Sequence, residues 1–114
     1  MPKSSTGLDE NVAGLLSYVL TWLTGIIFFV IEKNSKFVKF HAMQSIIFFG
    51  AITVVEIVFS ILALIPYVGI IFTIVNGLLG LFAFIMWIIL MIKAYQHQMF
   101  KLPIAGEMAE KYAK

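Results

Sequence analysis

The longest apolar stretch of the chain runs from Ala42 to Ile92 and reads AMQSIIFFGAITVVEIVFSILALIPYVGIIFTIVNGLLGLFAFIMWIILMI. Glu56 is its only charged residue. As helix it would extend about 75 Å, enough for two membrane crossings and a turn but not for three. We place the turn at Pro66 and Gly69, because proline cannot continue a helix and glycine relieves the backbone beside it. The stretch therefore predicts two antiparallel membrane helices, at about 42–65 and 68–92.

A third apolar stretch, from Val12 to Ile31, contains no charged residue and is again about as long as a hydrocarbon core requires. The alternating pattern of a barrel strand is missing, so all three stretches are read as helices. We expect an all-α integral membrane protein, a single domain over residues 1–114 with three transmembrane helices in an up-down-up bundle. A short interfacial helix start precedes the second helix, and residues 93–114 form a cytoplasmic tail.

Composition excludes several classes of protein. Of 114 residues, 61% are hydrophobic and 12% charged, with a mean hydropathy of +1.01, whereas a soluble domain has roughly a quarter of its residues charged. The absence of cysteine excludes disulfides and thiolate chemistry. A net charge of +2, without arginine, is too slight for nucleic-acid binding. The bilayer itself is the first predicted partner, and no nucleic acid is expected.

Lysines indicate the orientation. With three crossings, Lys3 lies on one side of the membrane and the other seven lysines, from Lys33 to Lys114, lie on the opposite side. Because positive charge is retained in the cytoplasm, this count predicts a cell-membrane protein with its N-terminus outside and its C-terminus in the cytoplasm.

Small residues along each stretch predict where helices meet, since lipid-embedded helices associate through close backbone approach and hydrogen bonds. The candidate packing positions are Gly25, Gly69, Gly77 and Gly80.

Glu56 is the most informative single residue, because a charge in the bilayer centre costs about 2.5–3.5 kcal/mol on insertion scales. Counted from the same membrane surface, Asn76 and either Ser17 or Thr21 lie at a similar depth. These four residues form a candidate intramembrane polar cluster. Two interpretations stay open: a neutral Glu56 that hydrogen-bonds the helices together, and a proton or cation site.

A second polar group surrounds the start of the second helix. The candidate interfacial motif is Lys39, His41, Gln44 and Ser45. His41, His97 and Glu32 could hold a divalent metal, but their spacing matches no compact motif, so no metal site is predicted. His41 and Ser45 lie one turn apart without a third catalytic member, so no enzyme is predicted either. Anchoring at the membrane surface is the simpler reading, with an anionic-lipid site as an alternative.

Five segments resemble an uncharacterised family of small archaeal and bacterial integral membrane proteins. They are TGLDENVAGLLSY from Thr6, FFVIEKN from Phe28, FVKFHAMQS from Phe37, KAYQ from Lys93 and FKLPIAG from Phe100. That family is distantly similar to a chloroplast inner-envelope protein-import component with four membrane helices. The resemblance implies a role related to a protein-translocation channel, with His41 and Gln44 in the shared motif.

The sequence gives no firm activity. A three-helix chain is too small to enclose a wide aqueous path, so we expect it to act by assembly, as a homo-oligomer or as a small subunit of a membrane complex. The alternative is a small ion, proton or solute transporter or channel subunit that uses Glu56 and Asn76. No cofactor is predicted, since no nucleophile, metal set or phosphate loop is recognisable.

Overall fold

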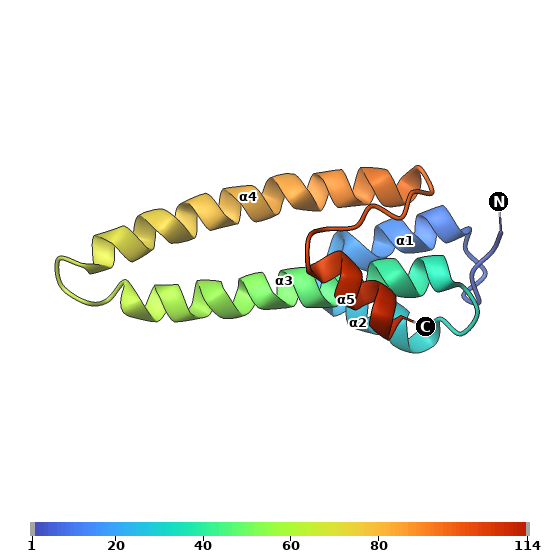
Figure 1. The fold of residues 1–114 in the computed structure, drawn as a ribbon, viewed down its shortest axis with the longest axis horizontal. Coiled ribbons are helices and arrows are strands. Elements are labelled where there is room, and N and C mark those ends of the chain that lie inside the picture. Colours follow the sequence, from blue (N-terminus) through green and yellow to red (C-terminus); the bar gives the residue numbers. More distant parts are fainter. Residues whose placement is uncertain (1, 114) are drawn as a thin grey trace.

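The structure is a computed structural model that describes residues 2–113, and it confirms an all-α protein. Within that range the helices are α1 (Glu10–Val19), α2 (Trp22–Ile31), α3 (Lys36–Leu62), α4 (Gly69–Tyr95) and α5 (Ala105–Tyr112). Figure 1 shows an elongated molecule, and its principal extents are 54 × 22 × 21 Å.

Helices α3 and α4 form a long antiparallel hairpin that organises everything else (Figure 1). Each has 27 residues, so each is about 40 Å long and exceeds the hydrocarbon thickness. Residues 63–68 make the turn, where Tyr67 has a φ of 67°. A side chain at Gly69 would lie 2.1 Å from the carbonyl oxygen of Ala63, so only glycine fits here. We call this turn the tip of the hairpin and the opposite end its base.

The segment from Val12 to Ile31 differs from the sequence prediction, because it is two helices rather than one. Helices α1 and α2 have ten residues each, about 15 Å, which is half a bilayer core. The chain reverses at Leu20 and Thr21, where Thr21 has a φ of 56°. Helix α1 leaves the base and α2 returns to it, so both ends of the chain lie at the base (Figure 1). The three-span count is therefore not confirmed, and two helices are long and apolar enough to cross a membrane within residues 2–113.

Side chains from other helices add hydrogen bonds to backbone carbonyls at the reversal. The Tyr18 carbonyl accepts from Trp87 Nε1 at 2.7 Å, and the Thr21 carbonyl accepts from Ser45 Oγ at 2.6 Å. Within the turn, Thr24 Oγ1 bonds the Ser17 carbonyl at 3.2 Å. Irregular backbone at membrane depth is tolerated only where its polar groups are satisfied by protein, and the carbonyls of this turn meet that condition.

The core lies at the base. Buried Tyr18, Phe49 and Leu90 join α1, α3 and α4 there, whereas in the tip half of α3 and α4 no large apolar side chain is buried and most are exposed. Helix α5 packs across α3 through Ala109 and Ala113 against Phe40. All five helices thus contribute to the base half of the molecule, whereas only α3 and α4 form the tip.

Candidate functional site

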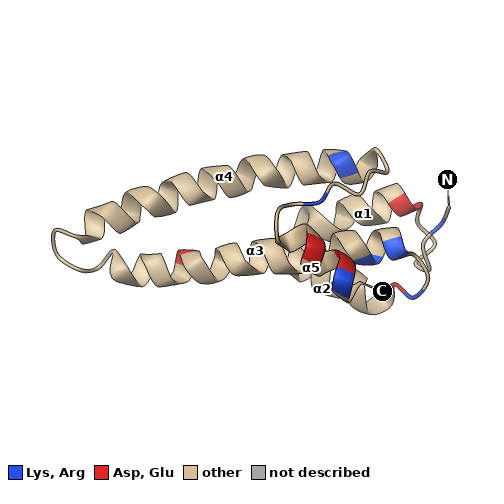
Figure 2. Ribbon diagram, in the orientation of Figure 1, with Lys and Arg blue, Asp and Glu red and all other residues tan. Residues whose placement is uncertain are grey.

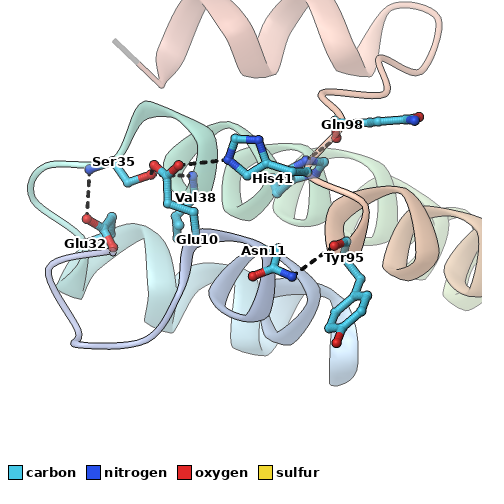
Figure 3. A network of polar contacts seen from close by, with 9 residues as sticks. Glu10, Asn11, Glu32, Ser35, Val38, His41, Tyr95 and Gln98 are labelled. Atoms are coloured by element: carbon cyan, nitrogen blue, oxygen red, sulfur yellow. Dashed lines mark hydrogen bonds and ion pairs between the residues drawn. The ribbon is translucent and has the colours of Figure 1, made fainter. Parts of the chain in front are cut away.

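The interfacial motif of α3 lies at the centre of a buried polar cluster, which we call the clamp: Tyr18, His41 and Gln44, each with no exposed surface. Tyr18 comes from α1 and the other two from adjacent turns of α3. The clamp bonds the strap, residues 96–104, which connects α4 to α5. His41 Nε2 lies 2.9 Å from the Gln98 carbonyl (Figure 3). Gln44 donates to the Phe100 carbonyl and accepts from the Leu102 amide, both at 2.9 Å.

The partners fix the direction of every hydrogen bond in the clamp. A carbonyl only accepts, so His41 Nε2 carries the proton, and Nδ1 of the neutral ring accepts from the Tyr18 hydroxyl at 2.7 Å. The Tyr18 oxygen in turn accepts from Gln44 Nε2 at 2.9 Å. Both ring nitrogens of His41 are thereby committed, so this histidine can neither act as a general base nor ligate a metal without dismantling the clamp. Its role is to fasten the strap to α3.

A second layer of polar contacts seals the base around Phe37, whose ring stacks on His97 at 4.3 Å and meets His41 edge-on at 4.6 Å. His97 Nε2 lies 2.9 Å from Glu10 Oε1. The Ser35 hydroxyl donates to the other Glu10 oxygen, and Figure 3 shows these two side chains facing each other. His97, His41 and Glu32, which were considered together as metal ligands, therefore each bond a different partner. Among residues 2–113 no group of three or more His, Asp or Glu side chains is placed to hold a metal ion.

Glu32 organises the loop between α2 and α3. It is almost fully buried, and its carboxylate accepts from the Ser5 amide, the Ser5 hydroxyl and the amides of Asn34 and Ser35. Burial alone would raise the pKa of Glu32, but these hydrogen bonds outweigh it and hold the pKa below its usual value. The N-terminal residues are thereby tied to the base.

The charged residues gather at the base, and Glu56 stands apart in the middle of the hairpin (Figure 2). Asn76 of α4 donates to the Glu56 backbone carbonyl at 3.1 Å and to the Ser60 hydroxyl at 3.0 Å. Gly80 faces the Glu56 carboxyl, since a Cβ there would lie 3.5 Å from Oε1. The structure thus brings Glu56 and Asn76 together, with Ser60 as a third member that the sequence reading missed.

The Glu56 carboxyl itself has no hydrogen-bond or ion-pair partner among residues 2–113. It lies in an open groove of about 440 Å³ on the tip half of α3. Asn76 Oδ1 is buried and likewise has no partner in the described part of the chain. The groove is lined by Ile52, Thr53, Glu56, Ile57, Ser60, Ile61 and Leu64.

Ser17 and Thr21 do not join this cluster. Ser17 is buried nearer the base and bonds the Ala13 carbonyl at 2.9 Å. Thr21 lies at the α1–α2 turn, in the wall of a second groove of about 490 Å³ that also includes Thr53 and Gly80. Of the polar cluster predicted from depth alone, the structure therefore brings together Glu56 and Asn76 but not Ser17 or Thr21.

The glycines and the rest of the interfacial motif have distinct environments. A Cβ at Gly25 would lie 2.8 Å from the Ala42 carbonyl, so α2 and α3 are in close contact there. Gly77 faces open space, with nothing within 4 Å of such a Cβ. The Lys39 amine lies 5.3 Å above the Phe29 ring, at the outer surface of the base.

Tyr18 and Trp87 are the site residues that sequence reasoning missed. Each of the two side chains forms hydrogen bonds with groups that are distant in the sequence. From the sequence alone, each is indistinguishable from an ordinary aromatic residue of a membrane helix. The one available signal was the position of Trp87 on the small-residue face of its helix, where a large ring needs a specific partner.

An exposed apolar helical hairpin with a buried polar base is the architecture of a small membrane protein. The chain belongs to the magnetosome magnetite crystal formation protein family, whose model matches residues 8–109. It is 52% identical to a UPF0132 membrane protein of Methanocaldococcus jannaschii over 114 residues, all of this chain and 97% of that protein. It is 48% identical to a UPF0132 membrane protein of Archaeoglobus fulgidus over 91% of this chain and 95% of that one. No solved structure matches the chain.

Proposed function

We propose that this protein acts by assembly in a prokaryotic cytoplasmic membrane, as a homo-oligomer or as a small subunit of a larger membrane complex. The observation that carries the proposal is the Glu56 carboxyl, which faces a groove and has no polar partner among residues 2–113. An unpaired carboxyl at this depth is costly, and intramembrane ionisable groups normally face a bundle interior or a polar partner. A neighbouring helix that donates a hydrogen bond would remove that cost.

The shape of the fold supports the same conclusion. On α3, Ser45 meets the α1–α2 turn, and Thr53, two helical turns closer to the tip, still lines a groove with Thr21. Further toward the tip the same face continues as Glu56 and Ser60, which α4 meets along one side through Asn76 and which α1 and α2 do not reach. The short α1–α2 hairpin therefore leaves a vacant position beside the tip half, at the place where a third spanning helix would have lain.

The topology that best fits this shape has two spans, with α1–α2 entering the membrane from the base and turning back. All eight lysines then lie at the base side and none at the tip, a stronger bias than the three-span count gives. We place the base, with both termini, in the cytoplasm. Single cysteines at Ser5, Tyr67 and Glu107, in a chain that has none, test this by labelling of intact cells with an impermeant reagent. Only position 67 should react, whereas reaction at position 5 would restore the three-span topology with the N-terminus outside.

The assembly proposal is tested by mass in mild detergent and by co-purification from native membranes. We expect the wild type to run as an oligomer or a complex, and Glu56→Leu to run as a monomer. Glu56→Gln should keep the assembly, because a carboxamide still hydrogen-bonds across helices. Val54→Leu, at an exposed site on the opposite side of α3 from Glu56, is the matched control. A wild-type monomer that brings down no partner from native membranes would overturn the proposal.

Asn76 favours a second candidate function, a small ion, proton or solute transporter or channel subunit. Its buried, unpartnered Oδ1 and the nearby Glu56 carboxyl supply two polar ligands in one place. Proton-coupled or cation uptake into vesicles, abolished by Glu56→Gln while assembly persists, would favour this alternative. The translocation-related role implied by the family resemblance is one form of complex that the assembly proposal includes. No enzymatic activity, cofactor or nucleic-acid partner is part of either proposal.

A further inference from the structure

Helix α5 is held in a fixed position on the hairpin. Ala105, Ala109 and Ala113 recur every fourth residue and are buried, the latter two against Phe40 of α3. The strap that leads into α5 is fastened by Gln44, as described above. The orientation of α5 about its own axis is therefore set by packing and by buried hydrogen bonds.

That orientation exposes a second apolar edge. Ile104, Met108 and Tyr112 follow the same four-residue spacing, and their exposed fractions are 75%, 40% and 53%. Ile104 has a φ of 65°, a conformation that a β-branched residue rarely adopts, and it still presents its side chain outward. Exposing an isoleucine side chain to water is unfavourable, whereas contact of the same side chain with hydrocarbon is favourable.

The charged residues of α5 border this edge or lie opposite it. Glu107 and Lys111 flank the edge, with the Lys111 amine 5.5 Å from the centre of the Tyr112 ring, and Glu110 lies on the opposite side of the helix. One face of α5 thus packs on protein, one is apolar and exposed, and one is polar, which is the pattern of a helix that lies in a membrane surface.

The depth of α5 on the hairpin matches such a surface. It lies beside Phe40 and Ile47 of α3, where the lysine-bearing first turns give way to the uncharged span. Lys36 and Lys39 precede this level on α3, and Lys101, which pairs with Glu110 at 2.5 Å, precedes α5. Lysines at this height are placed to meet anionic headgroups.

We propose that α5 lies in the membrane–water interface, with Ile104, Met108 and Tyr112 inserted among lipid chains and the neighbouring lysines favouring anionic lipid. The site is independent of Glu56, so it stands or falls separately from the assembly proposal.

The test uses the cysteine-free chain with a single cysteine at Met108 or, as the matched control, at Glu107, each carrying an environment-sensitive fluorophore. The full-length protein is reconstituted into phosphatidylcholine vesicles with and without phosphatidylglycerol. We expect blue-shifted emission at position 108 that nitroxide-bearing lipids quench, and water-like emission at position 107 that iodide quenches. Anionic lipid should increase the blue shift at 108.

Water-like emission at both positions would overturn the proposal. Shielding of both positions from lipid and aqueous quenchers alike would also overturn it, because a protein surface would then cover α5. The absence of any response to phosphatidylglycerol would overturn the preference for anionic lipid. Tyr112 provides a second labelling position on the same edge, and circular dichroism confirms that each labelled protein keeps its helices.

Discussion

Gln44→Leu tests whether the clamp holds the strap, since leucine has nearly the same size but no polar atoms. The substitution removes three hydrogen bonds, to the Tyr18 hydroxyl, the Phe100 carbonyl and the Leu102 amide. Two buried backbone groups lose their partners, each at a cost of about 1–3 kcal/mol. Because the strap can open toward water, part of this cost is relieved, and we expect local opening to become easier by about 2 kcal/mol.

The assay is hydrogen exchange at the Leu102 amide, which the Gln44 side chain protects directly. An opening free energy lower by about 2 kcal/mol corresponds to exchange about 30-fold faster. Gln98→Leu is the matched control, because the same change at an exposed strap side chain leaves the clamp intact and should leave exchange unaltered. Equal exchange rates in Gln44→Leu and wild type would refute the claim that these side chains fasten the strap.

Three further predictions concern the base. The pKa of Glu32 is lower in the folded protein than in the unfolded chain, so the stability that Glu32 contributes is present above the unfolded pKa of about 4.5 and is lost as pH falls through the folded pKa. The unfolding temperature of the wild type should therefore fall in acid. Glu32→Gln should be less stable than the wild type at neutral pH and should lose less stability in acid. Gly25→Ala should lower the unfolding temperature, because it forces a Cβ against the Ala42 carbonyl. Gly50→Ala should leave the unfolding temperature unchanged, because nothing lies within 4 Å of a Cβ at that position. An equal effect of the two substitutions would contradict close packing of α2 on α3. Trp87→Phe removes the indole N–H that donates to the Tyr18 carbonyl at the α1–α2 turn. Denaturant titration should show a loss of about 1–2 kcal/mol in the free energy of unfolding. Trp22→Phe, at an indole with no such bond, should change the free energy of unfolding far less.

The hairpin was predictable because its determinants are local. Length alone limits the stretch after Ala42 to two crossings, and Pro66 with Gly69 marks the turn. Helices α3 and α4 accordingly occupy this stretch, with ends that differ from the predicted ones by a few residues. The start of α3 moved toward the N-terminus because Ser35 caps it by accepting from the Val38 amide.

The reversal between α1 and α2 was not predictable from hydropathy, because twenty apolar residues can cross a bilayer or turn back halfway with the same composition. What decides is whether the backbone groups of the turn find partners, and two of those partners, Ser45 and Trp87, come from other helices. Within the segment itself, the only indication of the turn is the pair of threonines, Thr21 and Thr24, whose hydroxyls bond the Leu20 and Ser17 carbonyls.

The clamp shows the same division between what is local and what is not. His41 and Gln44 stood out because polar residues near a membrane surface need a reason, yet their partners are main-chain groups of the strap, more than fifty residues further along the chain. Main-chain groups leave no mark on the residue pattern, so a motif such as FVKFHAMQS can be recognised without its role. Glu56 is the converse case: its carboxyl has no hydrogen-bond or ion-pair partner among residues 2–113, and this is the observation behind the proposal that it meets a partner outside the chain.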